Sequence, residues 1–296
     1  MIKNTVLCLN RMKNNTYEVA LQCAQMQQNY GMKTFFLMSD RENIEKRVAA
    51  GGAHFSCEYI EEDAISDMDA MLVFGGDGTM LRVLDRYVPY DVPVLGINLG
   101  RLGFLPEVET ADMDRALQYL LEEKYEIEHR MMLYYHVSNR RESIVGYATN
   151  EISVSRGLSQ RMIAMDVKAD GRFVEHYIAD GALVASPTGS TAYSLSAGGP
   201  IISPDVDCLL VNPICPHALE SRPIILSDHC QVELCLNMKE ERKGMQFSAD
   251  GGEDHEMFNG DRVSIQRSPH DALMIRLPGE KNFFKVLKEK LSQYNL

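Results

Sequence analysis

The sequence predicts an α/β first part built on a parallel, doubly wound sheet, followed by a β-rich second part. Two observations carry this prediction. Up to a helix expected at about residues 112–122, short apolar runs alternate with segments of helical character, as in a parallel sheet whose strands are joined by helices. From His129 onward, the chain becomes a succession of short strand-like runs separated by turn residues.

The first part shows this alternation from its beginning. Strands are expected at residues 5–9, 33–38, 71–74 and 93–98, with helices at 17–30 and in a segment ending near residue 50. The third and fourth strands each run into a glycine-rich turn. Because ligands of doubly wound sheets bind beyond the carboxyl ends of the strands, both turns are candidate binding sites.

The second part reads as a series of short strands. These are expected at residues 132–138, 143–149, 152–154, 162–169, 172–178, 182–186, 224–226, 231–236, 245–249 and 262–267. Asp170 and Gly171 are expected to form a hairpin turn between two of them. The last segment, residues 283–294, has the pattern of an amphipathic helix.

Composition limits the classes of protein to consider. The 296 residues allow one large or two ordinary domains, and 45% hydrophobic with 24% charged residues is typical of a globular protein. A net charge of −12 argues against nucleic acid as a partner, although not against a nucleotide. Seven cysteines, an odd number without C-x-x-C spacing, indicate buried free thiols rather than a zinc site.

We expect neither a targeting sequence nor a membrane-spanning segment in this chain. Residues 1–7 resemble a first core strand rather than a signal peptide. No apolar stretch reaches the length of about 18 residues that a membrane-spanning helix needs. These features predict a cytoplasmic enzyme.

The most informative motif follows the third expected strand. It reads Gly75-Gly76-Asp77-Gly78-Thr79. Glycine permits positive φ and lets phosphates approach the backbone. The following residues have helical character, so their free N–H groups and the helix dipole favour an anion. A carboxylate at this position indicates phosphate chemistry on a nucleotide, and the alternative is a plain tight turn with a helix cap.

A second cluster of polar and small residues lies in the β-rich part. Residues 186–200 read Ser-Pro-Thr-Gly-Ser-Thr-Ala-Tyr-Ser-Leu-Ser-Ala-Gly-Gly-Pro, and Asp180 shortly precedes them. Hydroxyls, backbone amides and one aromatic ring can bind a ribose, an amide and a base; the alternative is a surface loop. The pair Asn150-Glu151 can grip ribose hydroxyls or an adenine edge, although the pair alone is a weak signal.

Together these motifs resemble the NAD kinases, which use ATP to phosphorylate the adenosine 2′-hydroxyl of NAD. The resemblance rests on residues 75–79, 150–151 and 187–200, together with 100–105 and 213–217, and is strongest between about residues 70 and 225. The glycine–aspartate turn alone also occurs in diacylglycerol and sphingosine kinases. The combination of this turn with the Asn150-Glu151 pair and the 187–200 segment is much more specific for NAD kinases.

The resemblance implies a domain layout and an assembly. It implies an α/β domain with a Rossmann-like parallel sheet at residues 1–128, to which residues 275–296 return, so that the C-terminal helix packs back on the first domain. Residues 129–274 form a β-rich NAD-binding domain, with NAD between the domains. NAD and ATP are the expected partners, with Mg²⁺ or another divalent metal, and a homodimer or homotetramer is expected.

The resemblance also implies roles for the first motif. Asp77 is the expected proton acceptor for the 2′-hydroxyl, with Gly78 beside it as a further NAD contact. The phosphates of ATP are expected at the backbone of this turn, with an arginine as a possible cationic partner: Gly75, Gly76, Gly78, Thr79 and Arg82. No metal-ligating residue is assigned.

The expected NAD contacts in the second part are more numerous. They are Asn150, Glu151, Arg161, Ile178, Asp180, Thr191, Ala192, Tyr193, Ser194, Leu195 and Ser196. Ile178 stands where several members of the family have arginine or histidine, so only its backbone and packing can serve there. Asp250 is compatible with a ligand contact or a structural turn, and His217 with lining the site or holding a loop.

Two other functions compete with this one. A lipid kinase of the diacylglycerol or sphingosine type shares the glycine–aspartate turn, but it needs an apolar slot and often a basic or amphipathic membrane-facing surface. A non-catalytic dinucleotide sensor would keep the NAD contacts and lose the acid, whereas Asp77 is present. The sequence does not decide whether the acceptor is NAD or NADH, or whether the phosphoryl donor is ATP or polyphosphate. It also leaves open whether NADP(H) inhibits the enzyme by feedback.

Overall fold

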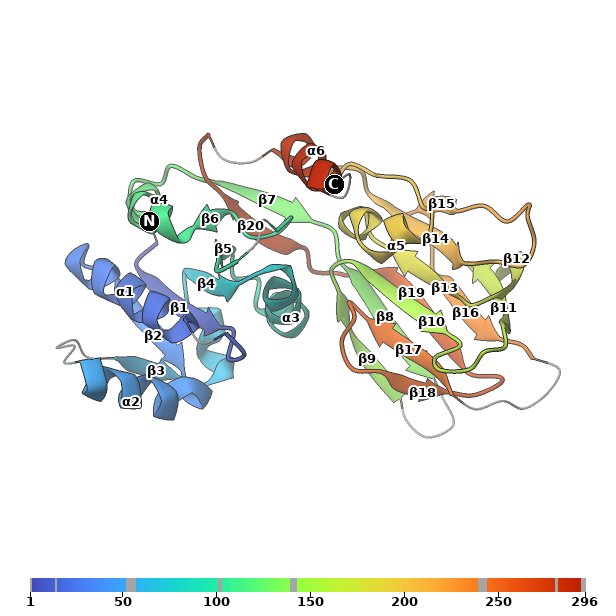
Figure 1. The fold of residues 1–296 in the computed structure, drawn as a ribbon, viewed down its shortest axis with the longest axis horizontal. Helices are drawn as coiled ribbons and strands as arrows, with labels where there is room; N and C mark the ends of the chain where they lie inside the picture. Colours follow the sequence, from blue (N-terminus) through green and yellow to red (C-terminus); the bar gives the residue numbers. More distant parts are fainter. Residues whose placement is uncertain are drawn as a thin grey trace. The chain divides into compact units, whose positions relative to one another are not determined.

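The chain divides into two compact units. The computed structural model describes residues 2–13, 15–51, 57–100, 103–138, 143–238, 244–279 and 282–293. One unit comprises Met1–His129 together with Ala272–Leu296, and the other comprises Arg130–Asp271. The first unit is therefore completed by a segment that follows the second unit in the sequence (Figure 1).

The first unit is built on one sheet with the strand order β3-β2-β1-β4-β5-β20-β7, and β6 pairs with β5. The strands are β1 (Asn4–Leu9), β2 (Lys33–Leu37), β3 (Glu58–Ile60), β4 (Ala70–Gly75), β5 (Val94–Asn98), β6 (Val108–Glu109), β7 (Glu126–Arg130) and β20 (Ala272–Arg276). Neighbours from β3 to β20 pair in parallel, which confirms the predicted parallel sheet. All six residues of β4 are buried, because helices cover both faces of a doubly wound sheet.

Helices connect these strands. They are α1 (Thr16–Asn29), α2 (Arg41–Gly51), α3 (Asp77–Tyr87), α4 (Met113–Leu121) and the terminal α6 (Phe283–Gln293). The predicted helices at 17–30, 112–122 and 283–294 correspond to α1, α4 and α6, although residue 294 lies outside the described residues. No helix in the described ranges is both long enough and apolar enough to cross a membrane.

A largely buried arginine ties the returning segment to the rest of the first unit. Arg276, at the end of β20, bonds the carboxylates of Glu107 and Glu128. Burial alone would lower the pKa of Arg276, but the two carboxylates outweigh it and raise that pKa. The Glu107 side chain is almost fully buried, and its backbone N–H donates to the Gly96 carbonyl at 3.0 Å. The loop after β5 is thus fixed by a strand from the other end of the chain.

The second unit contains two antiparallel sheets, β15-β14-β13-β10-β17-β18 and β12-β11-β16-β19-β8-β9. Their strands are β8 (Leu133–Ser138), β9 (Ser143–Ala148), β10 (Glu151–Ser155), β11 (Ile163–Ala169), β12 (Arg172–Ala179), β13 (Gly181–Ala185), β14 (Cys208–Ile214), β15 (Ile224–Ser227), β16 (Val232–Leu236), β17 (Met245–Ala249), β18 (His255–Met257) and β19 (Arg262–Arg267). Both sheets contribute to one hydrophobic core, for example through Val154 and Val167. The predicted β-rich part is confirmed.

Local and non-local strands differ in how well the sequence predicted them. The hairpin between β11 and β12 is confirmed, and Asp170 and Gly171 have φ of +50° and +73°, as a tight hairpin turn requires. The prediction omitted β14, a fully buried strand containing Pro213. Proline normally argues against a strand at the centre of a sheet, yet Pro213 here faces Ala182 of β13.

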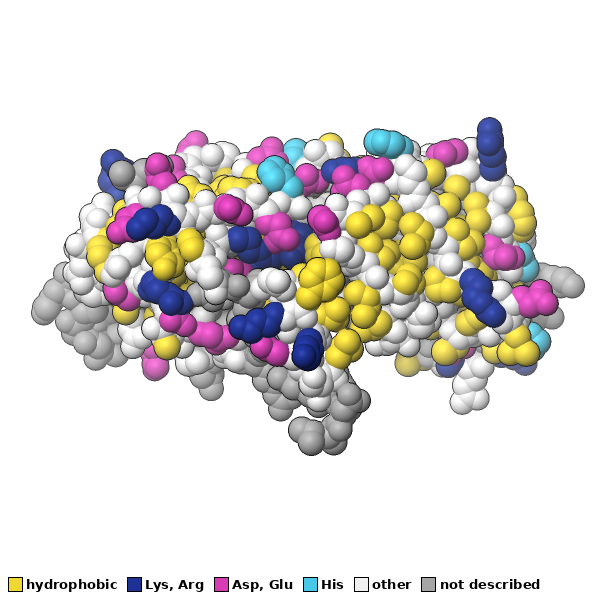
Figure 2. Space-filling model, turned by 90° about the horizontal axis from the view of Figure 1, so that it is seen from above, with side chains coloured by type: hydrophobic (Ala, Val, Ile, Leu, Met, Phe, Trp, Pro, Cys, Tyr) yellow, Lys and Arg dark blue, Asp and Glu magenta, His cyan; other side chains and the backbone are white. Residues whose placement is uncertain are grey.

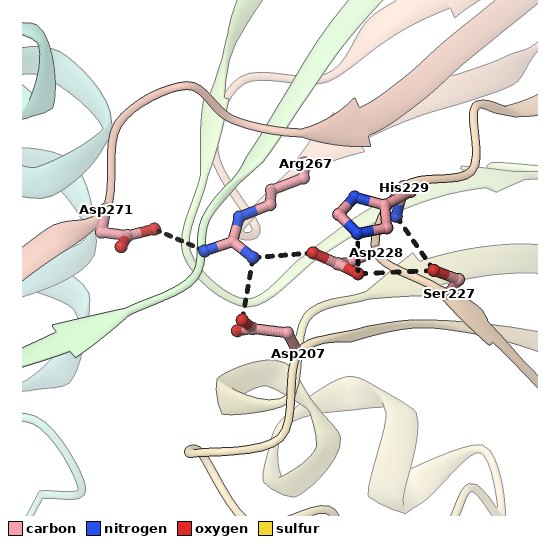
Figure 3. Close-up of polar contacts among 6 residues, drawn as sticks. All are labelled: Asp207, Ser227, Asp228, His229, Arg267 and Asp271. Atoms are coloured by element: carbon pink, nitrogen blue, oxygen red, sulfur yellow. Dashed lines mark hydrogen bonds and ion pairs between the residues drawn. The ribbon is translucent and has the colours of Figure 1, made fainter.

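Three carboxylates converge on Arg267 at the end of β19 (Figure 3). Its guanidinium lies 2.9 Å from Asp207, 2.7 Å from Asp228 and 3.5 Å from Asp271. The hydrogen bond from Arg267 lowers the pKa of Asp228. This network fastens the start of the segment that leads into β20 to two loops of its own unit.

The surface carries charges of both signs. Figure 2 shows acidic and basic side chains intermixed over part of the face in view, and hydrophobic side chains gathered over another part. The exposed large hydrophobic residues of the second unit include Ile178, Tyr193, Ile201, Val206 and Ile225.

The Arg276 network makes a prediction about stability. Arg276→Met removes the guanidinium that compensates the buried Glu107 carboxylate, so we expect the first unit to lose about 3–5 kcal/mol of unfolding free energy. The measurement is urea unfolding followed by circular dichroism. Arg115→Met is the control, because Arg115 and its ion-pair partner Asp112 are both exposed, and an exposed pair is worth at most about 1 kcal/mol. Equal effects of the two substitutions would contradict the stabilising role of Arg276.

Candidate functional site

The glycine–aspartate motif joins a buried strand to a helix in the first unit. Gly75 is the last residue of β4, Gly76 is the N-cap of α3, and Asp77 is the first residue of that helix. The predicted arrangement of strand, turn and helix N-terminus is therefore confirmed. It places the Asp77 carboxylate at the carboxyl end of a central strand, where doubly wound sheets bind ligands.

The glycines of this motif do not adopt positive φ, which corrects the expectation from the sequence, and close packing requires glycine only at Gly75, since a Cβ on Gly76 or Gly78 would meet open space. Gly75, Gly76 and Gly78 are absent from the positions with positive φ, and Gly76 has φ of −118°. A Cβ on Gly75 would instead overlap the side chain of Thr79. The Thr79 hydroxyl in turn accepts a hydrogen bond from the Asn10 side chain at 2.8 Å, which links the motif to the end of β1.

Backbone amides from a neighbouring loop hold the Asp77 carboxylate. The N–H of Phe104 donates to its Oδ2 at 3.1 Å, and the N–H of Leu105 donates to its Oδ1 at 2.9 Å. Gly103 permits this approach, because a Cβ there would overlap both the Asp77 carboxylate and Pro106. Asp77 nevertheless keeps 34% of its side chain exposed. The second glycine-rich turn thus orients the carboxylate of the first.

The other expected phosphate contacts occupy different environments. Gly78 and Arg82 are exposed, and Gly76 is half-buried. The N–H of Thr79 already donates to the Gly76 carbonyl at 2.9 Å, and its side chain is buried. Arg101, in the second glycine-rich turn, lies outside the described residues.

A carboxylate in the second unit organises the Asn150-Glu151 turn. The two Oδ atoms of Asp250 accept hydrogen bonds from the N–H groups of Thr149, Asn150 and Glu151 at 2.7, 2.8 and 2.9 Å. The N–H of Asp250 donates back to the Glu151 carbonyl at 2.9 Å, and Asp250 has φ of +50°. These contacts give Asp250 a structural role at this turn, which the sequence had left open.

Glu151 lies in an unusual environment for a carboxyl group. It is only 8% exposed, and its Oε2 is buried without a hydrogen-bond partner among the described residues. Burial, together with the nearby charge of Asp250, raises its pKa to about 8, and a hydrogen bond from the Tyr193 backbone opposes the shift. Glu151 is therefore largely protonated at neutral pH and can donate a hydrogen bond.

Buried hydroxyls hold the 186–200 segment against this turn. Ser186 donates to the Thr149 carbonyl at 2.5 Å, and the Ser186 N–H donates to the Asn150 carbonyl at 2.9 Å. Gly189 lies so close to Asn150 that a Cβ would overlap the Asn150 carbonyl. The two motifs, about forty residues apart in sequence, are thus packed against each other within one unit.

The candidate residues of this segment divide into exposed and packed groups. Tyr193 and Ser196, in the short helix α5 (Tyr193–Ser196), are exposed, and Thr191, Ala192 and Leu195 are half-buried. Ser194 is fully buried, and its hydroxyl and carbonyl both accept hydrogen bonds from Asn212. Ser194 therefore fixes the helix that presents Tyr193.

The remaining candidates lie near the ends of β12 and β10. Asp180 forms an ion pair with Arg156 at 2.7 Å, an arginine that the sequence analysis did not single out. Ile178 is 49% exposed, and its carbonyl accepts a hydrogen bond from the N–H of His217 at 2.8 Å. Arg161 is exposed. His217 thus contributes at least a loop-fixing backbone contact.

Comparison with known proteins identifies the family. One family model, the ATP-NAD kinase N-terminal domain, matches residues 5–125, and another, the ATP-NAD kinase C-terminal domain, matches residues 149–277. The chain belongs to the NAD kinase family. It is therefore an enzyme of the kinase class.

Individual relatives agree with this assignment. The NAD kinase of Symbiobacterium thermophilum is 43% identical over 233 residues, which are 78% of this chain and 81% of that protein. The NAD kinase of Moorella thermoacetica is 38% identical over 234 residues, which are 79% and 74% of the two chains.

Solved structures share the fold. A yeast NADH kinase complexed with NADH has a TM-score of 0.86 at 25% identity, covering 98% of this chain and 88% of that one. An Archaeoglobus fulgidus NAD kinase in complex with ATP has a TM-score of 0.66 at 24% identity and covers 99% of both chains. The predicted fold class is confirmed.

The raised pKa of Glu151 predicts a pH-dependent stability. Between its ordinary value of 4.5 and about 8, the folded state holds a proton that the unfolded state lacks, so stability falls as pH rises. We expect Glu151→Gln to gain stability over the natural protein by up to about 1.4 kcal/mol per pH unit in this window. Thermal unfolding between pH 5 and pH 8.5 measures it. The exposed Glu220→Gln is the control, and parallel curves for all three proteins would refute the assignment.

Proposed function

We propose that this enzyme transfers the γ-phosphoryl group of ATP to the 2′-hydroxyl of the adenosine of NAD, giving NADP and ADP. The observation that carries the proposal is the Asp77 carboxylate, oriented by the Phe104 and Leu105 amides at a strand end and partly open to solvent. The family assignment supports it, because the relatives are named NAD kinases.

Asp77 has the role of proton acceptor in this proposal. As the 2′-oxygen forms a bond to the γ-phosphorus, the bond from phosphorus to the β,γ-bridging oxygen breaks, and ADP leaves. The hydroxyl proton passes to the Asp77 carboxylate. Because a carboxylate is a weak base, its larger contribution is to orient the hydroxyl, and the rest of the catalysis is positioning and neutralisation of charge.

The second unit supplies the proposed NAD contacts. The turn at Asn150 and Glu151 and the residues around Tyr193 are packed together by Ser186 and Gly189, which supports their acting as one binding surface. Glu151, protonated at neutral pH, donates a hydrogen bond to a ribose or adenine acceptor. Tyr193 offers an exposed ring, and Asp180 an oxygen already oriented by Arg156. We further propose Arg161, Ile178, Thr191, Ala192, Leu195 and Ser196 as contacts.

The first unit is the proposed site of ATP, with its phosphates at the turn of Gly75, Gly76, Gly78 and Thr79 and with Arg82 as a cationic partner. The described residues hold no group of three His, Cys, Asp or Glu side chains placed to bind a metal. Mg²⁺ in phosphoryl transfer is commonly held by one or two carboxylates together with substrate phosphates, so the phosphates of ATP would supply part of its ligands here. The ion would neutralise phosphate charge.

Other features of the proposal follow the family resemblance. We propose that the first unit is the α/β kinase domain with its C-terminal return, and that the second is the NAD-binding domain. A homodimer or homotetramer is the proposed assembly.

Removal of the proposed base tests the mechanism. Purified protein is incubated with ATP, magnesium and NAD, and NADP is followed with an NADP-specific dehydrogenase. We expect Asp77→Asn to lower kcat by about 10²–10⁴-fold, because the amide cannot accept the proton. The exposed Asp67→Asn should retain activity. Near-normal turnover by Asp77→Asn would defeat the base assignment, and turnover of a lipid alcohol without NADP formation would overturn the function.

The Asp250 contacts make a separate prediction for the second unit. Asp250→Ala removes the acceptor of three consecutive N–H groups and releases the Asn150-Glu151 turn. We expect the KM for NAD to rise by about tenfold or more, as for loss of roughly 1–3 kcal/mol of buried hydrogen bonding, with a smaller change in the KM for ATP. The exposed Asp254→Ala is the matched control. An unchanged KM for NAD would contradict this role.

A further inference from the structure

The terminal helix brings a lysine to the proposed catalytic carboxylate. The Nζ atom of Lys290 lies 3.2 Å from Oδ2 of Asp77 and 4.3 Å from the centre of the Phe104 ring. The Lys290 side chain is only 20% exposed. Helix α6 and Asp77 belong to the same unit, although 213 residues separate the two side chains in the sequence.

The sequence of α6 explains why this lysine points inward. Val286 is buried, and Phe283 and Leu287 are half-buried, so these residues form the apolar stripe of the helix. Lys290 follows Val286 by four residues and continues the same face. Lys285 and Lys288 are exposed. Lys290 therefore occupies a position where an amphipathic helix would ordinarily carry an apolar residue.

An aromatic ring adds to this ion pair. The Lys290 side chain is 20% exposed and that of Asp77 34%, and the ammonium lies over the face of the Phe104 ring, where a cation–π contact adds attraction. Within the described part of the chain, Asp77 thereby has three donors: two backbone N–H groups and one ammonium. Lys290 and the Phe104 N–H both donate to Oδ2, whereas among the described residues Oδ1 accepts a hydrogen bond from the Leu105 N–H alone.

We propose that Lys290 is a positioning residue for phosphoryl transfer, which acts by orienting the Asp77 carboxylate and keeping a positive charge beside it. The inference rests on the proposed function of Asp77. With Oδ2 engaged by the ammonium, the carboxylate turns Oδ1 to the hydroxyl that loses its proton. The positive charge also compensates the phosphate charge that gathers near the carboxylate during transfer.

Steady-state kinetics of three variants test this role. We expect Lys290→Ala to lower kcat by about 10- to 100-fold, as for a misplaced catalytic group, with the KM for NAD changed by less than about threefold. Lys290→Arg keeps the charge and should recover most of the loss. Lys288→Ala, an exposed lysine of the same helix, should match the natural protein.

Two further measurements separate positioning from simple stability. Added methylamine or ethylamine should restore kcat of Lys290→Ala in a saturable manner, because a small ammonium can occupy the vacated place. In thermal unfolding, the Lys290→Ala and Asp77→Asn substitutions should be non-additive, because they remove the same contact. A slow Lys290→Ala variant that neither amines nor Lys290→Arg restores would show a structural role and overturn the inference.

The experiments distinguish a failure of the positioning role of Lys290 from a failure of the proposed function. If the natural protein makes no NADP, the proposed function fails, and the unfolding cycle alone decides whether Lys290 contacts Asp77. If the natural protein makes NADP and Lys290→Ala has normal kcat, only the positioning role fails.

Discussion

The loop after β5 is the constraint on which the arrangement of the first unit depends. Its far end is anchored by Glu107, whose buried carboxylate pairs with Arg276 of the returning strand. Just before Glu107, the loop presents the N–H groups of Phe104 and Leu105 to Asp77. A buried carboxylate without its partner is strongly unfavourable. Arg276 therefore does more than stabilise an edge of the sheet, because it fixes the loop whose amides orient the carboxylate proposed to react.

A carboxylate that accepts hydrogen bonds from backbone N–H groups also occurs in the second unit, where it has a different role. Asp250 accepts hydrogen bonds from three consecutive N–H groups of the 149–151 turn, and Asp77 accepts hydrogen bonds from two N–H groups of its neighbouring loop. In the first unit the loop holds the carboxylate, which stays partly open and can react. In the second unit the carboxylate holds the loop, which can then bind a ligand. Two aspartates in glycine-containing turns thus have opposite functions, and the turn sequence alone does not distinguish them.

The sequence predicted those features that depend on local pattern. The strand before Gly75, the β11–β12 hairpin and the stripe of α6 are all determined within a few residues. The sequence could not predict β20 beside β5, because parallel pairing between residues 94 and 274 leaves no local trace. Arg276 and Arg156 were missed because their partners are distant in the sequence, and Lys290 was missed as well. The polar residue within the apolar stripe of α6 was a usable signal for Lys290.

The two proposed site carboxyls illustrate how environment divides roles between similar groups. Glu151 is buried beside Asp250, and its raised pKa makes it a neutral hydrogen-bond donor at physiological pH. Asp77 instead has two amides and an ammonium around it and remains accessible. A proton acceptor must be ionised and exposed to its substrate, whereas a group that recognises an acceptor atom on the ligand must carry a proton. Their different surroundings therefore support the proposal that Asp77 serves catalysis and Glu151 recognition, although both residues end in the same functional group.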